Sequence, residues 1–262
     1  MRNEDRKLAA CCVPVILLCA ELSFAGPLQA SPRFERSWSG RFALAPGGKL
    51  AVENVQGGVW VEGWDRAEVE VKVAKTTWGS SDRLDDVRIA IDFGDHSLRF
   101  RTLYPQDLDE PIRVDYRLRV PRQVRLQGLR TLQGDILVRD VEGVVDARTL
   151  KGNIEQVNVA GPLVASTLAG NIAVSLRALP EAQAPLVLDT LNGNVDLLLP
   201  PRPNADLELT AVSGRIEGNY LFEVSSVAGD GARRARVGRG GVRVVVRTVR
   251  GNIRVGERND LA

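Results

Sequence analysis

The sequence predicts an all-β protein whose second half is a β-helix or β-solenoid, a stack of short strands coiled about one core. A glycine returns every nine residues from Gly134 to Gly170, and an aliphatic residue stands two positions before and two after each of these glycines. No stretch shows a long helical apolar period with caps. Because only 5% of the 262 residues are aromatic and 44% are apolar, the core must be mostly aliphatic.

The first thirty residues (1–30) have the pattern of a signal peptide. A basic start precedes an apolar run from Leu8 to Ala20 that is too short to span a bilayer comfortably, and small residues at Ala25 and Ala30 suit cleavage. An uncleaved membrane anchor is the alternative interpretation. All three cysteines lie in this segment: Cys11, Cys12 and Cys19. We therefore expect an exported protein, in the periplasm or at the cell surface, whose mature chain has no disulfide and no thiolate metal site.

After a linker over 31–40, residues 40–256 are expected to form one domain that begins with a strand-rich head over 40–122. Four segments of this head alternate apolar and polar residues, as half-buried strands do. They are Glu68–Lys75, Val87–Phe93, Leu98–Leu103 and Val114–Val120. Residues 82–86 suit one helical turn. We expect long antiparallel strands in the head that cover one end of the stack and protect its open edge.

Residues 123–256 are expected to hold the coils, followed by a tail over 257–262. Glycine suits the corner of a coil because it accepts positive φ and a close neighbouring backbone. The repeat glycines are Gly57 upstream, then Gly134, Gly143, Gly152, Gly161, Gly170, Gly193, Gly214 and Gly251. Threonine three residues before the glycine alternates with Asp or Asn, so the full unit has eighteen residues in two unequal halves. The flanking aliphatic residues should stack in inward columns.

Wider spacing between the later glycines predicts loops around 180–185, 200–203 and 225–241. The chain also resembles the bacterial "putative adhesin" domain-of-unknown-function family, which is related to the head-GIN adhesin-like domains. The resemblance extends over about residues 40 to 256. Its matching pieces are Val52–Val59, Gly63–Asp65 with the strand after it, Tyr116–Pro121, and the Thr-Leu-x-Gly-Asn-Ile motifs at 149–154 and 167–172. The resemblance implies a β-helix-like fold and export, and it offers no catalytic residues to carry over.

Residues with catalytic chemistry are few in the mature chain. The net charge of +2 does not indicate nucleic-acid binding. The one histidine, His96, falls in a predicted hairpin turn, where an exposed polar role is expected. Four carboxylates could meet on adjacent coils as in a polysaccharide lyase or hydrolase: Asp135, Asp140, Asp146 and Glu155. Since asparagine fills the positions of Asp135 and Asp140 in other repeats, a turn role is favoured for both. We expect no cofactor, no metal and no enzymatic activity.

Two features suit binding instead. Trp60 stands between Val59 and Val61, which take inward positions, so its ring should face outward, where it could stack on a sugar or fill a partner's pocket. Packing beneath the head hairpin is the alternative. The C-terminal stretch is rich in arginine, notably Arg233, Arg234, Arg236 and Arg239. These side chains could pair with anionic envelope polymers. The alternative interpretation places them in a mobile loop, with the later arginines on a solvated face and the charged edge of a last strand.

The sequence thus predicts a non-enzymatic binding or structural module of the cell envelope. An envelope glycan or an envelope protein is the expected partner, and contact with a membrane is expected only through an uncleaved signal segment. A polysaccharide lyase or hydrolase on the same scaffold is one alternative function. A scaffold or sensor domain for a protein partner is the other. The sequence gives no indication of the oligomeric state.

Overall fold

A computed structural model describes residues 33–106, 111–181, 184, 186–220, 223–224 and 232–258. The expected signal peptide lies outside these residues, as does part of the 225–241 insertion. The described residues belong to one compact unit, Pro32–Ala262. They are all β apart from one 3-10 turn, η1 (Ser81–Asp85), which falls where the sequence predicted a helical turn. No helix within the described part is long and apolar enough to cross a membrane.

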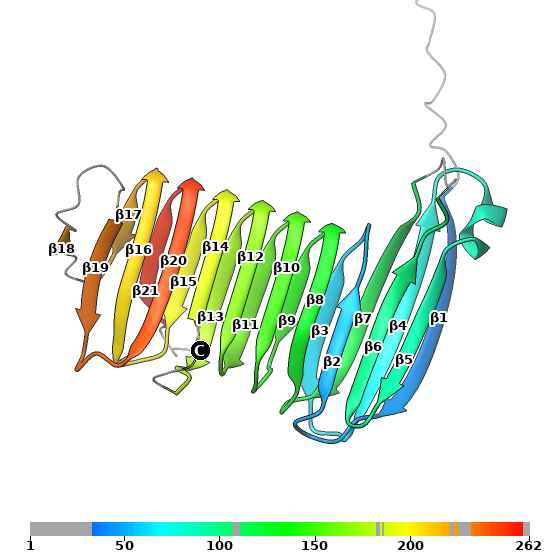
Figure 1. Ribbon diagram of the computed structural model, residues 1–262, viewed down its shortest axis with the longest axis horizontal. Coiled ribbons are helices and arrows are strands. Elements are labelled where there is room, and N and C mark those ends of the chain that lie inside the picture. The colour runs from blue at the N-terminus through cyan, green and yellow to red at the C-terminus, as the bar shows by residue number, and fades with distance from the viewer. Residues whose placement is uncertain are drawn as a thin grey trace, which may run out of the picture. The chain divides into compact units, whose positions relative to one another are not determined.

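Two large sheets contain the described strands (Figure 1). The ten-stranded sheet has the spatial order β1 (Phe34–Ala43), β4 (Glu68–Thr77), β7 (Arg113–Pro121), β3 (Val59–Trp64), β9 (Ile136–Arg139), β11 (Ile154–Ala160), β13 (Ile172–Ala178), β15 (Val195–Leu199), β21 (Ile253–Glu257) and β17 (Ile216–Gly218). The eleven-stranded sheet runs β18 (Glu223–Val224), β19 (Ala232–Val237), β16 (Ala205–Ser213), β20 (Val242–Arg250), β14 (Leu186–Asn192), β12 (Leu163–Ala169), β10 (Val145–Lys151), β8 (Arg125–Gln133), β2 (Lys49–Glu53), β6 (Ser97–Leu103) and β5 (Arg88–Gly94).

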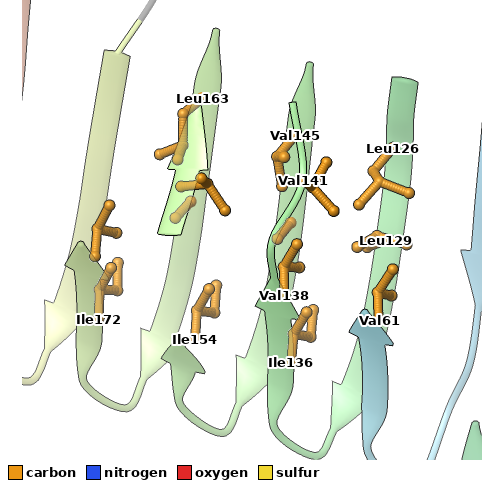
Figure 2. Close-up of a cluster of buried hydrophobic side chains, with 14 of the residues drawn as sticks. Val61, Leu126, Leu129, Ile136, Val138, Val141, Val145, Ile154, Leu163 and Ile172 are labelled. Atoms are coloured by element: carbon orange, nitrogen blue, oxygen red, sulfur yellow. The ribbon is translucent and has the colours of Figure 1, made fainter. Parts of the chain in front are cut away.

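From β8 to β15 the chain alternates between the two sheets, and each strand pairs in parallel with the next strand of its own sheet. Val145 is in register with Leu163 in one sheet, and Ile154 is in register with Ile172 in the other. Each pair is eighteen residues apart, as the double period of the sequence predicted. The inward residues therefore form columns, which Figure 2 shows for Ile136, Ile154 and Ile172.

The inward columns contain only some of the aliphatic residues that were predicted to flank the glycines and point inward. The aliphatic residues two positions after the glycines are buried in the core, with Ile216 partly exposed. Of those two positions before, Val141 and Val159 are buried, but the others are between 37% and 55% exposed. The exposed ones are Val55, Leu132, Leu150, Leu168, Leu191, Val212 and Val249. The prediction that they point inward is wrong because the preceding residue, a threonine in five coils and Asn54 or Ala211 in the other two, takes the inward place. The next residue of an extended strand must then face outward.

The repeat glycines occupy two different corners. At the corner between β12 and β13, Gly170 has φ 157°, and a Cβ added there would lie 1.9 Å from the carbonyl oxygen of Gly152. An added Cβ on the other glycines of this column would lie 1.8 to 2.0 Å from a backbone oxygen of the neighbouring strand or coil: Gly57, Gly134, Gly152, Gly193, Gly251 and Gly214. Gly143 and Gly161 belong to the opposite corner, after Asp140 and Asn158 at φ 55° and 57°. In the column that contains Gly170, only glycine fits, because any Cβ would overlap a backbone oxygen whatever the φ angle of the residue.

Polar side chains tie each glycine corner to the next. The Thr149 hydroxyl donates to the carbonyl oxygen of Gly134 at 3.1 Å, and four further threonines make the same bond: Thr131, Thr167, Thr190 and Thr248. The residue after the glycine accepts a bond from the next coil, as when the Asn171 amide donates to Asn153 Oδ1 at 2.9 Å. The same bond links Asn153 to Asp135 at 2.7 Å. This ladder satisfies corner amides that would otherwise need water.

The head differs from the predicted antiparallel arrangement. The β5–β6 hairpin is antiparallel as predicted, and β4 pairs antiparallel with β1 and β7. However, β2 pairs in parallel with β6 and β8, and β3 pairs in parallel with β7 and β9. The reason is that Gly57 begins a coil of its own, which stacks on the coil of Gly134. The antiparallel strands β1, β4 and β5 lie beyond it at one end of each sheet.

The C-terminal strands do not stack in chain order. Strand β20 lies between β14 and β16, and β21 lies between β15 and β17. They are therefore interior strands rather than the charged edge that the sequence analysis allowed. Part of the predicted 225–241 loop is a strand, because β19 pairs antiparallel with β16 through Asp206 and Leu207. The loops predicted around 180–185 and 200–203 fall between strands, although residues 182, 183 and 185 lie outside the described part.

We predict that Ile154→Ala lowers the free energy of unfolding by about 2–5 kcal/mol, because it empties a fully buried place in a packed column. Chemical denaturation measures the change. Leu150→Ala is the matched control, since Leu150 is 48% exposed and its truncation should cost far less. Equal losses for the two variants would contradict the inward and outward assignment.

Gln156 is a polar side chain that is fully buried between Val138 and Val174 of the neighbouring strands. Neither its side-chain oxygen nor its nitrogen has a protein hydrogen-bond partner. We predict that Gln156→Leu raises the free energy of unfolding by about 1–3 kcal/mol, because the cost of an unsatisfied buried amide disappears. A denaturation midpoint at or below that of the wild type would contradict this expectation.

Two substitutions test whether the close backbone contact at the corner requires glycine. They are at Gly170, which has that contact, and at Gly47, which does not. Gly170→Ala should cost several kcal/mol, because its Cβ meets a backbone oxygen that cannot move without shifting a coil. Gly47, at φ 80°, has no heavy atom within 4 Å of an added Cβ, so Gly47→Ala should show only the strain of positive φ, about 1–2 kcal/mol. Thermal unfolding of both variants checks the difference. Similar losses would show that φ alone fixes the glycines.

Candidate functional site

Trp60 lies on the outer face of the ten-stranded sheet. Its neighbours along β3, Val59 and Val61, are buried, whereas Trp60 is half-buried. The strands on either side bring Arg117 and Leu137 into register with it. The β5–β6 hairpin belongs to the other sheet, so Trp60 does not pack beneath it. Trp60 therefore faces outward, as the sequence analysis expected.

The Trp60 ring has two close neighbours. The guanidinium carbon of Arg117 lies 5.5 Å from the ring centroid, within cation–π range. The ring also lies against Gly58, where an added Cβ would come within 2.6 Å of the indole. Gly58 thus takes the place that Asp or Asn fills in later coils, and its missing side chain makes room for the ring. This arrangement fixes the orientation of the indole.

A groove of about 340 Å³ opens beside Trp60. Strands β3, β4, β7 and β9 line it, and most of its side chains are charged. The lining residues are Trp60, Val61, Glu62, Glu70, Lys72, Arg117, Leu118, Arg119, Leu137 and Arg139. With four cationic and two anionic side chains, the groove is positively charged. We call it the Trp60 groove.

The two acids of the Trp60 groove are engaged by neighbouring cations. The Glu70 side chain is only 12% exposed, and its carboxylate lies 3.0 Å from Arg41, 3.8 Å from Lys72 and 4.0 Å from Arg119. Glu62 lies 3.6 Å from Arg119. The charges in the row across the sheet therefore alternate in sign, and Arg117 forms no ion pair with another described residue. Its guanidinium, stacked on Trp60, leaves N–H groups to bind an anion.

The other tryptophans lie outside this groove. The indole N–H of Trp64 donates to the Glu68 carbonyl at 2.8 Å and closes the turn into β4, which is a structural role. Trp38 on β1 and Trp78 are 43% and 53% exposed. Only Trp60 combines an outward ring with a cationic groove among these four residues.

The predicted arginine site does not assemble at one place within the described residues. Arg234 and Arg236 point to the outer face of β19, while Arg233 has the alternate, inward phase. Arg236 pairs with Asp206 at 3.1 Å, and the backbone amide of Arg239 donates to Asn204. A Gly241 amide and the Arg236 guanidinium together lower the pKa of Asp206. These contacts fasten β19 and the turn that follows it to β16.

The carboxylates considered for polysaccharide cleavage are each used by the fold. Asp135 accepts the Asn153 amide at one corner, and Asp140 accepts the Asn158 side chain at the opposite corner. Asp146 pairs with Arg148 at 2.8 Å, and Glu155 pairs with Arg139 at 3.7 Å. His96 is exposed in the β5–β6 turn at φ 57°. No three His, Cys, Asp or Glu residues of the described part could together hold a metal ion.

Sequence reasoning identified Trp60 but missed its partners. Arg117 lies 57 residues further along the chain, and Leu137 lies 77 residues further, so only the strand register brings them together. The available signal was the outward phase of Arg117 and Arg119 on the predicted 114–120 strand. It could not be used without knowing that this strand pairs in parallel with β3.

Comparisons with known proteins give likenesses in structure alone. No family model and no curated protein matches the chain. It is similar to the structure of a "putative cell adhesion protein" from Clostridium sporogenes, with 11% identity, 85% of this chain and 100% of that chain covered, and a TM-score of 0.47. It is also similar to a "putative adhesin" from Bacteroides fragilis, with 10% identity, 84% of this chain and 97% of that chain covered, and a TM-score of 0.44. For a "putative lipid binding protein" from Parabacteroides distasonis the identity is 6%, 86% of this chain and 97% of that chain are covered, and the TM-score is 0.28.

The first two descriptions name the adhesin-like class that the sequence resemblance named. None of the three names an enzyme or a head-GIN domain. The likenesses are too distant to transfer any residue role, so the site rests on the geometry of this chain.

Proposed function

We propose that the protein is an exported, non-enzymatic, adhesin-like module of the cell envelope that binds an anionic glycan in the Trp60 groove. The observation that carries this proposal is the Trp60 indole, oriented by Gly58 and Arg117 beside a groove with an excess of cations. An indole face packs on the C–H face of a sugar ring, and the guanidinium groups pair with carboxylate or sulfate groups.

The two acids of the groove have a supporting role in this proposal. Glu62 and Glu70 hold Arg119 and Lys72 in place, so the cations are oriented before a ligand arrives. A preoriented guanidinium loses less side-chain entropy on binding than a free one. No proton transfer is needed, which fits a binding site rather than a catalytic one.

We infer further that the two-sheet stack is a β-solenoid that serves as a rigid scaffold. Parallel strands with an eighteen-residue register in both sheets support this inference. Neighbouring strands lie about 4.8 Å apart, so outward charges on successive strands recur at that spacing. The 1–30 segment supports export, as a cleaved signal peptide or as an anchor. An envelope protein in place of a glycan is the second possible partner.

We predict that Trp60→Ala weakens binding to a polyuronate such as polygalacturonate by about tenfold or more, because a central aromatic contact is removed. Surface plasmon resonance with the immobilised polymer measures the affinity. Raising the salt concentration should weaken the wild-type interaction as well, since the cations act through charge.

Trp78→Ala is the matched control, because Trp78 is exposed but lies outside the Trp60 groove. It should leave the affinity unchanged. If Trp60→Ala binds acidic and neutral polysaccharides as the wild type does, or if both variants lose affinity equally, the groove is not the binding site.

A further inference from the structure

The seven exposed aliphatic side chains at the glycine corner form one continuous line, which we call the aliphatic ridge. In spatial order it consists of Val55, Leu132, Leu150, Leu168, Leu191, Val249 and Val212. Six of these are the penultimate residues of β8, β10, β12, β14, β20 and β16. The ends of these strands lie side by side along one edge of the eleven-stranded sheet (Figure 1).

The ridge is not a requirement of the fold. Each ridge residue follows an inward, buried Thr, Asn or Ala and itself faces solvent, so a polar residue would serve the strand equally well. Yet a large aliphatic residue stands at this place in seven coils, each 37% to 55% exposed. At about 4.8 Å a coil, the line is roughly 30 Å long. A contiguous exposed apolar surface of this kind marks a contact with an apolar partner.

The charges beside the ridge restrict what that partner can be. The residues two positions before and one position after the ridge side chains include five basic and two acidic ones. The basic ones are Arg130, Arg148, Lys151, Arg247 and Arg250, and the acidic ones are Glu53 and Asp189. All seven are exposed. Glu53 is also paired with Arg99 at 3.9 Å, and Arg148 with Asp146 at 2.8 Å. The partner must therefore combine apolar groups with negative charge.

We propose that the aliphatic ridge docks the protein on an anionic phospholipid surface. In this geometry the ridge enters the boundary between headgroups and acyl chains, and the basic side chains on either side lie at the level of the phosphates. A bilayer accommodates a line of separate apolar side chains flanked by cations. A second copy seated on the ridge would bring two basic rows together, which charge repulsion opposes.

This docking leaves the Trp60 groove free. The ridge belongs to the outer face of the eleven-stranded sheet, and Trp60 lies on the outer face of the ten-stranded sheet. The sequence analysis expected membrane contact only through an uncleaved signal segment. The ridge is a second and independent route, which uses the folded domain itself.

Vesicle co-sedimentation of the full chain tests the proposal, with vesicles of phosphatidylcholine alone and of phosphatidylcholine with phosphatidylglycerol. The wild type should bind the anionic vesicles more tightly, and salt should weaken that binding. The double variant Leu150→Ser/Leu168→Ser should bind them about tenfold more weakly or worse, because two exposed leucines no longer leave water. Leu198→Ser is the matched control, since Leu198 is 43% exposed on the opposite sheet and should not matter.

A second measurement separates the ridge from residues 1–30, which are present in every variant. Phosphatidylglycerol with a photoreactive acyl chain should label the C-terminal ends of β8, β10, β12 and β14, as found by mass spectrometry. Labels confined to residues 1–30 would overturn the proposal. Unchanged vesicle binding by the double variant, or an equal loss for Leu198→Ser, would also overturn it. So would a ridge-dependent dimer seen by analytical ultracentrifugation without any change in vesicle binding.

Discussion

The structure depends on the close approach of backbones at one corner of each coil. At Gly152 and Gly170 the carbonyl oxygen of one coil takes the space where a Cβ of the next would stand. Because the coils come this close, the threonine of one coil reaches the glycine carbonyl of another, and the Asn side chain reaches the next amide. The glycine column thereby sets both the spacing and the register of the coils. The hydrophobic columns follow from that register.

The same corner produces the two surfaces to which we assign binding. The inward threonine forces the next residue outward, so the leucines before the glycines become a ridge rather than core. At the first coil Gly58 replaces the Asp or Asn of later coils, and the Trp60 ring occupies the vacated space. The two binding surfaces that we propose are therefore made of outward side chains that the stacking of the coils does not itself require.

The sequence predicted the all-β class, the eighteen-residue unit and the corner role of glycine, because these follow from residue chemistry at a fixed spacing. It placed Leu132 and Leu150 inside because an aliphatic residue in a repeat usually packs in the core. The nine-residue spacing alone does not show whether the threonine or the leucine beside it points inward. It could not place β20 between β14 and β16. The glycine motif at Gly251 would look the same whether its coil stacked on that of Gly193 or on that of Gly214. The groove was also beyond reach, because Arg117 meets Trp60 only through a long-range register.

Amide hydrogen exchange at the glycine corners tests the stacking most directly. The Asn153, Asn171 and Asn194 amides lie in exposed turns, yet each donates to a side-chain oxygen of the coil before it. If the corners stack as described, these amides exchange only on large-scale opening and are protected like the core strand amide of Ile154. Exchange at the rate of free loop amides, while Ile154 stays protected, would contradict the corner as the feature that holds the coils in register.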